Sequence, residues 1–371
     1  MNPEIIIENI SIKNFRNHNQ FKIENNNPIV VINGNNGSGK TNTLEAISIF
    51  SPGKGLRGAN LDEMLNNNSQ TRSFEISIDL RFKNGSIKLS KKYDTENKSE
   101  NFYKINNEKI KTVELLNYLN ILWITPIMEK VMLQNNTEKR NFIDRLIFNL
   151  HKDHLNTYTK LQKCIRERLI LLKNQSYDEN WITNIEKNIS ELSANVGLNR
   201  KKYINLINQT LIDFLDPMSL CQIDLKYKNN LFNQDVEKKE VIKLYCIELK
   251  KNRELDLKSN RLNMGINSLK IDILRGKENP IDAKHCSSGE QKSMLISIII
   301  SVAKLIKKMR NGGNIVLLID EAMAHLDDYH KEKLYNEIRD LNCHVWLTGV
   351  SKDLFWGFRD QTVFIDVKNT I

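Results

Sequence analysis

The feature that most constrains this chain is the segment Gly34-Asn-Asn-Gly-Ser-Gly-Lys-Thr41, which fits the pattern G-x-x-x-x-G-K-[ST]. A wholly apolar run at 28–33 precedes it, as in a buried parallel strand, and the pattern at 40–50 is helical. The glycines allow backbone N–H groups to curl around phosphates, and the helix N-terminus adds its positive dipole end. The segment therefore predicts a phosphate-binding loop, with a plain glycine-rich turn as the alternative. The candidate nucleotide-binding residues are Gly34, Asn35, Asn36, Gly37, Ser38, Gly39, Lys40 and Thr41.

A second apolar run ends in an acidic pair. Residues 315–319 are Ile-Val-Leu-Leu-Ile, and Asp320 and Glu321 follow them. With a phosphate loop upstream, this pattern predicts ATP with Mg²⁺, in which Thr41 and Asp320 hold the metal ion and Lys40 reaches the β- and γ-phosphates. Glu321 would act as general base toward the attacking water. The predicted catalytic residues are thus Glu321 and Lys40. Without the phosphate loop, the acidic pair would equally fit a helix cap.

The remaining patterns indicate an α/β protein. Strands are expected at 4–13, 20–24, 73–82, 86–90, 221–227, 268–274 and 345–348, with an Asn-Gly hairpin turn at 83–85. Long helices are expected at 138–173 and at 181–215, the latter stopped at Pro217, and a short polar loop joins them. This arrangement predicts an antiparallel helical hairpin. Further helices are expected at 235–255 and 286–309.

Composition excludes several classes of protein. No apolar run reaches the 18 or more residues that a membrane helix needs, and the first 12 residues do not resemble a signal peptide. The five cysteines are scattered without a C-x-x-C pair, which argues against disulfides and a structural zinc site. We therefore expect a cytoplasmic protein without a membrane partner. The formal charge of +10 permits binding to a polyanion, although the lysines are too dispersed to locate it.

A third motif points to a particular group of ATPases. The segment Cys286-Ser-Ser-Gly-Glu-Gln-Lys292 resembles the signature of ABC-type ATPases, and Ala324-His-Leu-Asp327 is similar to their D-loop. The resemblance implies that Ser287 and Gly289 bind the γ-phosphate held by a second copy of the chain, with Asp327 beside the nucleotide. It thus implies an ATP-dependent homodimer. The alternative for the signature is an ordinary helix N-cap.

Within this group, the sequence between the phosphate loop and the signature separates the branches. It lacks the very long coiled coils of chromosome-maintenance proteins and the zinc-binding apex of double-strand-break-repair proteins. The whole chain instead resembles the RecF family of bacterial recombination-mediator ATPases. Besides the ATPase motifs, the residues that carry this resemblance are Ile12-Lys-Asn-Phe-Arg-Asn17, Ser51-Pro-Gly-Lys-Gly-Leu-Arg57, Trp123-Ile-Thr-Pro126 and Glu138-Lys-Arg-Asn-Phe-Ile-Asp-Arg145.

This resemblance implies an ABC-type ATPase head formed by residues 1–122 and 260–371, with a helical lobe inserted at 123–259. It also implies a role in DNA replication, recombinational repair and the SOS response. The protein would bind single-stranded or gapped DNA and help RecO and RecR load recombinase at gaps, while a weak DNA-dependent ATPase activity is left open. The sequence departs from the family at Gly265-Ile-Asn and at Lys139-Arg-Asn141, where groups that could act on DNA or nucleotide are lost.

Several positions and functions stay open. Thr348 would face the γ-phosphate or simply end a strand, and Gln134 lies where a metal-contacting glutamine could occur. Arg16 and Arg57 are nucleotide contacts by resemblance, or solvated surface residues. Two rival functions are another ATP-gated DNA clamp, such as a phage-defence ATPase, and a nucleotide-gated scaffold that binds only proteins.

Overall fold

The chain folds into two compact units, which we call the head unit and the inserted unit. The head unit comprises Met1–Lys130 with Leu295–Ile371, and the inserted unit comprises Val131–Met294. These divisions lie later in the sequence than the expected boundaries after 122 and 259. The structure is a computed structural model, and it describes all residues except 2, 70, 98–100, 175–177, 213–220, 227–236, 277–278, 311–312, 322–325 and 368–371. In the ranges described, no helix is long and apolar enough to cross a membrane.

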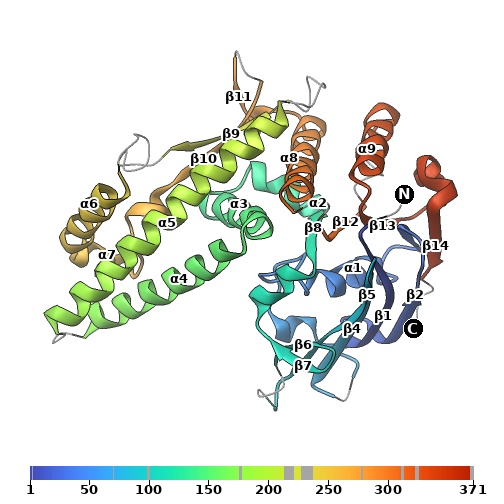
Figure 1. The fold of residues 1–371 in the computed structure, drawn as a ribbon, viewed down its shortest axis with the longest axis horizontal. Coiled ribbons are helices and arrows are strands. Elements are labelled where there is room, and N and C mark those ends of the chain that lie inside the picture. The colour runs from blue at the N-terminus through green and yellow to red at the C-terminus, as the bar shows by residue number, and fades with distance from the viewer. Residues whose placement is uncertain are drawn as a thin grey trace. The chain divides into compact units, whose positions relative to one another are not determined.

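A five-stranded, all-parallel sheet forms the centre of the head unit (Figure 1). Its strand order is β14 (Thr362–Asp366), β3 (Ile29–Asn33), β13 (His344–Gly349), β12 (Ile315–Ile319) and β8 (Asn120–Ile124). Every residue of β8, β12 and β13 is buried, as expected for strands covered on both faces. The sequence predicted β3, β12 and β13, but it did not predict β8, β14 or helix α9 (Asp328–Leu341).

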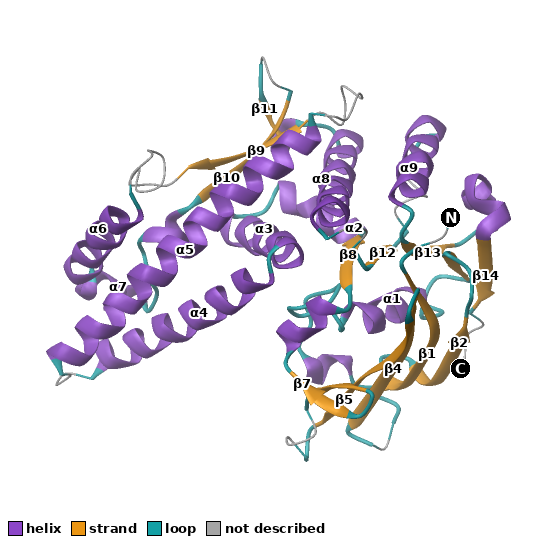
Figure 2. Ribbon diagram, in the orientation of Figure 1, coloured by secondary structure: helices purple, strands orange, loops and turns teal. Residues whose placement is uncertain are grey.

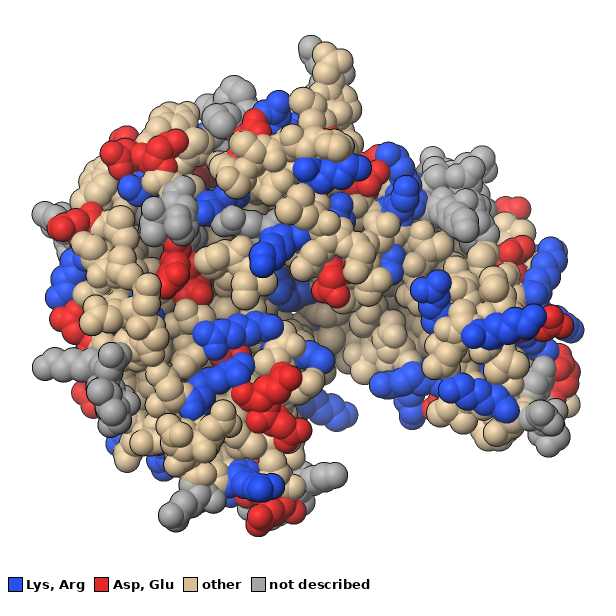
Figure 3. All heavy atoms as spheres, turned by 180° about the vertical axis from the view of Figure 1, so that it is seen from behind, with Lys and Arg blue, Asp and Glu red and all other residues tan. Residues whose placement is uncertain are grey.

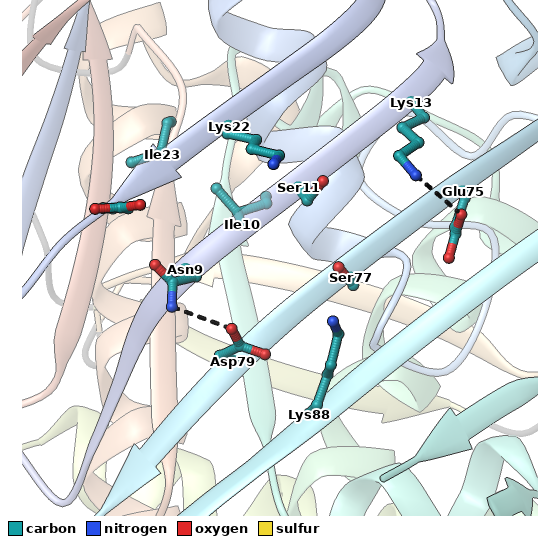
Figure 4. Close-up of a pocket in the computed structure, with 11 residues that line it drawn as sticks. Asn9, Ile10, Ser11, Lys13, Lys22, Ile23, Glu75, Ser77, Asp79 and Lys88 are labelled. Carbon is teal, nitrogen blue, oxygen red and sulfur yellow. Dashed lines mark hydrogen bonds and ion pairs between the residues drawn. The ribbon is translucent and has the colours of Figure 1, made fainter. Parts of the chain in front are cut away.

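A second, antiparallel sheet completes the head unit. Its order is β2 (His18–Glu24), β1 (Ile5–Phe15), β4 (Ser73–Phe82), β5 (Gly85–Asp94), β6 (Tyr103–Ile105) and β7 (Glu108–Ile110). The predicted hairpin is present, because Phe82 pairs with Gly85 across the Lys83-Asn84 turn. The polar face holds a groove of about 370 Å³, shown in Figure 4, where Lys13 pairs with Glu75 and Asn9 with Asp79.

The inserted unit is mainly helical, and Figure 2 shows its helices beside a small sheet. Helices α4 (Lys152–Lys173) and α5 (Glu179–Leu211) pack as the predicted hairpin. One predicted helix, 138–173, is wrong as a single element, because His151 adopts extended backbone angles between α3 (Asn136–Leu150) and α4. The predicted helix at 235–255 is likewise two helices, α6 (Lys238–Lys251) and α7 (Arg253–Ser259), separated at Asn252. Pro217 and Tyr227 lie outside the described residues.

A three-stranded antiparallel sheet and the signature helix complete this unit. The sheet order is β11 (Ile281–Asp282), β10 (Lys270–Arg275) and β9 (Cys221–Lys226). Helix α8 (Ser288–Met309) begins two residues later than predicted and continues into the head unit after Met294. The signature motif therefore belongs to the inserted unit, together with β9 and β10, and the chain returns to the head unit only after it, at Leu295.

A buried network of ion pairs ties the helices of the inserted unit together. Arg168 on α4 is 1% exposed and donates to Glu186 on α5 at 2.9 Å and to Asp256 on α7 at 2.7 Å. Its remaining nitrogen donates to the carbonyl of Leu249 on α6 at 2.7 Å. Arg253 also donates to Glu186, at 2.7 Å. One guanidinium thus joins four helices, and its loss would leave buried carboxylates with fewer partners.

We expect Arg168→Met to lower the free energy of unfolding by about 3–5 kcal/mol, because removing one partner of a buried ion pair leaves uncompensated charge. The matched control is Arg166→Met on the same helix, where the side chain is exposed and the expected change is within about 0.5 kcal/mol. Urea unfolding followed by circular dichroism measures both. Equal unfolding midpoints for the two variants would show that the network does not hold the helices.

Candidate nucleotide-binding site

The predicted site residues of the head unit meet at the carboxyl ends of neighbouring parallel strands. β3 leads into the Gly34–Thr41 loop, β13 ends with Thr348 and Gly349, and β12 is followed by Asp320. Because β13 lies between β3 and β12, the side chain of Thr348 lies between the loop and the acidic pair. Ligands of open parallel sheets bind at this edge. The strand order of the sheet thus brings together the Gly34–Thr41 loop and Asp320, which are separated by about three quarters of the sequence.

The phosphate loop has the conformation that its sequence predicts. Gly37 and Gly39 have φ angles of 83° and 101°, which side chains other than glycine rarely adopt. A Cβ on Gly39 would lie 2.7 Å from His18 Cε1, so the loop also requires glycine for space. Lys40 Nζ donates to the carbonyls of Gly34 at 2.7 Å and Asn35 at 3.0 Å. The ammonium group is therefore held at the mouth of the loop, before helix α1 (Lys40–Ser48).

The turn between β1 and β2 braces this loop, a role that the sequence analysis missed. Asn17 Nδ2 donates to the carbonyl of Gly37 at 3.4 Å, and its side-chain oxygen accepts from Asn42 Nδ2 at 2.6 Å. Buried His18 contacts the carbonyl of Gly39 at 3.2 Å and the hydroxyl of Thr43 at 3.3 Å. Burial lowers the pKa of His18, against the hydrogen bond to Gly39. No sequence pattern links these residues to the loop, because the contacts span some 20 positions.

A line of hydrogen bonds joins the loop to the acidic pair. The hydroxyl of Thr41 donates to Asp320 Oδ1 at 2.8 Å, and the hydroxyl of Thr348 donates to the same oxygen at 2.8 Å. Thr348 Oγ1 in turn accepts the backbone N–H of Glu321 at 2.9 Å. Thr348 therefore orients both acidic residues, which is more than a strand-end threonine would do.

The two carboxylates have different surroundings. Asp320 is 6% exposed, and burial raises its pKa, against the hydrogen bonds from Thr348 and Thr41 that lower it. Glu321 is half-buried and has a φ angle of 48°, in the left-handed region that is costly for a residue with a side chain. Its carboxylate forms no hydrogen bond within the described part of the chain, so it is free to act on a bound molecule.

The side chains present at this edge fit a nucleotide with a hard metal ion. Ser38 Oγ is buried without a hydrogen-bond partner among the described residues, so a bound phosphate could provide one. Thr41 and Asp320 already place a hydroxyl and a carboxylate side by side, and oxygen donors of this kind are what Mg²⁺ prefers. The donor set therefore suits phosphate oxygens and a magnesium ion.

Arg16 and Arg57, two expected nucleotide contacts, converge on a buried acid. Glu45 on α1 is fully buried, and Arg16 Nη2 donates to it at 2.6 Å and Arg57 Nη1 at 3.0 Å. Arg57 also donates to Asn42 Oδ1 at 2.7 Å. The structure thus shows both arginines fixed beside α1 by a carboxylate that the sequence analysis did not single out.

The signature residues lie in the inserted unit at the exposed start of α8. Ser287 Oγ accepts the backbone N–H of Glu290 at 3.3 Å, and Glu290 accepts the backbone N–H of Ser287 at 2.7 Å. This reciprocal pair is a capping box, which the spacing Ser287-x-x-Glu290 contains. Arg275 on β10 pairs with Glu290 and fixes it further. Gly289 is exposed, and a Cβ there would contact nothing within 4 Å.

The remaining candidates have local roles in this structure. Asp327 is the N-cap of α9, where its side chain accepts the backbone N–H of His330 at 2.9 Å, and this bond lowers the pKa of Asp327. Ala324 and His325 of the D-loop segment lie outside the described residues. Gln134 is half-buried in the inserted unit, after the short helix α2 (Pro126–Glu129) of the head unit. Its backbone N–H donates to the carbonyl of Val131 at 3.3 Å.

Comparison with known proteins identifies close relatives along nearly the whole chain. Residues 6–362 match the family described as RecF/RecN/SMC N terminal domain. The chain is 31% identical over 363 residues to the DNA replication and repair protein RecF of Rickettsia prowazekii, covering 97% of this chain and 99% of the relative. It is 30% identical to the protein of the same name from Rickettsia bellii, over 93% of this chain and 94% of the relative.

Solved structures share the fold. The recombination mediator protein RecF with ATP, of the RecFOR pathway, matches with a TM-score of 0.83 at 23% identity over 95% of this chain and 94% of that one. An Smc head domain from Pyrococcus furiosus matches more distantly, with a TM-score of 0.54 at 15% identity, covering 98% of this chain and 94% of that one. The predicted α/β ABC-type ATPase fold with an inserted helical lobe is therefore confirmed.

Proposed function

This chain belongs to the RecF family, and on that premise we propose that it is an ATP-gated DNA-binding protein of DNA replication and recombinational repair. The hydrogen bonds that link Thr41, Asp320, Thr348 and the backbone of Glu321 support the ATP-dependent part of this proposal. The likeness to RecF proteins over nearly the full length carries the DNA-dependent part.

Each side chain has a distinct task at this site. The amides of Gly34–Gly39 and the ammonium of Lys40 bind the phosphates of ATP. Thr41 and Asp320 would hold Mg²⁺, which would offset charge on the phosphate oxygens. Thr348 fixes the positions of the Asp320 carboxylate and the Glu321 backbone through its two hydrogen bonds. Glu321 accepts a proton from the water that attacks the γ-phosphate. Turnover is weak on this proposal, with ATP binding rather than its hydrolysis driving association with DNA.

Two copies of the chain share each nucleotide. Ser287 and Gly289 of one copy contact the γ-phosphate held by Lys40 of the other, so that ATP joins two heads. Two observations support this arrangement: the capping box holds the start of α8 in a defined shape, and both residues are exposed there. A helix N-terminus with free amides suits an anionic group. Asp327 would complete the nucleotide site from the D-loop segment.

DNA would be bound mainly through its phosphates. The net charge of +10 favours a polyanion, and on the face drawn in Figure 3 the Lys and Arg side chains are dispersed among acidic ones. Such contacts give affinity that falls with salt and carries little sequence information. Single-stranded or gapped DNA is the proposed target, with RecO-like and RecR-like proteins as partners in loading recombinase and inducing the SOS response in the cytoplasm.

Binding to gapped duplex DNA with and without ATP tests this proposal. Fluorescence anisotropy across a salt series should give tight binding only with ATP, and an affinity that falls steeply as salt rises. ATP-dependent dimerisation without any DNA binding at low salt would contradict it and favour the alternative of a nucleotide-gated protein scaffold.

A further inference from the structure

A cavity of about 570 Å³ lies in the head unit, apart from the phosphate loop. Its walls come from the segment after α1 and from β5, β6 and the strand ends around β7. None of the residues Gly34–Thr41 lines it. Ile49, which does, follows the C-terminal end of α1, about 13 Å along that helix from the loop. The volume lies within the range of small-molecule sites.

The charged residues that line this cavity in the described part of the chain are all positive. They are Lys54, Lys91 and Lys111, and no described Asp or Glu lines it. None of the three forms an ion pair in the described ranges, and Lys54 Nζ donates instead to the neutral Asn60 Oδ1 at 2.9 Å. The groove on the polar face of the same sheet differs, because Glu24, Glu75 and Asp79 balance its lysines (Figure 4). An anion therefore suits the cavity and not the groove.

Lys91 is the buried lysine among the three that line this cavity. It is 4% exposed, and its ammonium lies 4.5 Å from the centre of the Tyr103 ring. Burial lowers its pKa to about 8, so the charged form is disfavoured in the folded protein. A buried ammonium without a carboxylate is costly for folding. Groups of this kind gather at functional sites, where a ligand supplies the missing partner.

The rest of the wall is apolar and partly aromatic. Phe102, Tyr103, Leu61, Met64 and Ile110 line it beside the lysines. Two further lysines lie close to the Phe102 ring, with Lys109 Nζ 3.9 Å and Lys104 Nζ 5.2 Å from its centre. Lysines beside aromatic rings are the combination that binds nucleotide units, with phosphate on the charges and the base on the apolar wall.

We propose that this cavity binds one nucleotide unit, its phosphate on Lys91, Lys54 and Lys111 and its base against the wall formed by Phe102 and Tyr103. The nucleotide comes from one of two sources, a free mononucleotide or an unpaired nucleotide of single-stranded DNA. The second source deepens the DNA-binding function proposed above and rests on it. Such a site would let the head unit recognise the single-stranded part of a gap.

The main test compares Lys91→Met with Lys88→Met. Both remove one positive charge from β5, but residues three apart on a strand lie on opposite faces, and Lys88 lines the charge-balanced groove instead. Anisotropy with a fluorescent 20-residue oligothymidylate and ATP should show about a three- to tenfold loss of affinity for Lys91→Met, and a salt slope reduced by about 0.7. Lys88→Met should change affinity less than about twofold.

A second variant and two further probes identify the ligand. Phe102→Leu keeps the wall apolar but removes the ring, and should weaken oligothymidylate binding by about fivefold or more. Thymidine monophosphate, titrated against protein whose phosphate loop is filled with a slowly hydrolysed ATP analogue, tests the free-nucleotide source. Polyglutamate tests whether any anionic polymer suffices. Binding of either nucleotide probe that depends on both Lys91 and Phe102 supports the site and names its source.

Stability measurements separate binding from folding. The folded pKa of Lys91 is lowered, so the unfolded chain holds more protons between about pH 8 and the ordinary lysine value near 10.5. The wild type should therefore gain stability as pH rises through that window. Lys91→Met should lack this gain and be at least as stable as the wild type at pH 7. A variant that melts earlier at pH 7 would contradict the picture of a costly buried charge kept for a ligand.

Further outcomes separate failure of the cavity as a nucleotide site from failure of the proposed function. If wild type binds oligothymidylate but both variants bind it equally well and thymidine monophosphate does not bind, the cavity is not a nucleotide site, while the proposed function stands. Competition by polyglutamate alone would overturn the assignment in favour of an acidic peptide. If wild type binds no DNA at all, the proposed function fails first, and only Lys91-dependent binding of thymidine monophosphate would keep the cavity as a nucleotide site.

Discussion

Glu321→Gln is expected to bind ATP as the wild type does, to lose hydrolysis by about 100-fold or more, and to accumulate as an ATP-bound dimer. The amide keeps the size of the side chain, and the backbone N–H of Glu321 still donates to Thr348. Asp320 and Thr41 are untouched, so the metal site stays intact. Only the proton acceptor for the attacking water is lost. Analytical sedimentation with and without ATP, together with phosphate release, measures both effects.

The control for this variant is Glu332→Gln, which removes the same charge from the exposed surface of α9. It should dimerise and hydrolyse ATP like the wild type. A monomeric Glu321→Gln protein at saturating ATP would mean either that Glu321 is not the base or that ATP does not join two heads. Undiminished hydrolysis would exclude Glu321 as the base directly.

Ser287→Arg is expected to bind ATP normally but to hydrolyse it at least about 100-fold more slowly. On the proposed arrangement, Lys40 of the same chain binds the nucleotide, and Ser287 acts on the nucleotide of a second chain. The exposed start of α8 leaves room for the arginine in one copy, so the block arises only when two heads meet. Ser287→Ala removes the capping hydroxyl without bulk, at about 1 kcal/mol of helix stability, and should retain part of the turnover. Normal turnover by Ser287→Arg would contradict the shared site.

The fold was predictable where one pattern dominated. The apolar runs of β3 and β12 identified a parallel sheet, and the Asn-Gly turn located the β4–β5 hairpin. β8 was missed although its residues are all buried, because so short an apolar run cannot be told from part of a buried helix by its pattern alone. The break at His151 was missed for a different reason: the helical pattern continues across it, and only packing of α3 and α4 decides the angle.

The site was predictable where its residues follow a motif in sequence. Gly34–Thr41 and Asp320 carry local signals, and the structure places Thr41 and Asp320 in contact. His18 and Glu45 carry none, because a buried histidine and a buried glutamate appear in sequence as ordinary polar residues. Their roles arise only when the β1–β2 turn folds onto the loop and two arginines converge on α1.

Within one chain, the contacts of the signature motif are those of an ordinary helix cap. Ser287 and Glu290 form a capping box, and an identical box would form in a helix with no ligand at all. The proposed role of Ser287 therefore depends on a second copy, and it can be decided only by an experiment on two chains.

Mixing Lys40→Ala with Ser287→Arg protein tests the central claim, that each active site is built from two chains. Neither variant alone should hydrolyse ATP. In the mixture, the intact phosphate loop of one chain can meet the intact signature of the other and rebuild one site per heterodimer. We predict partial recovery of ATP hydrolysis, or recovery of ATP-driven dimerisation alone if both sites must act together. A mixture no more active and no more dimeric than its separate components would contradict the account, as would Ser287→Arg alone hydrolysing at the wild-type rate with a specific activity independent of protein concentration.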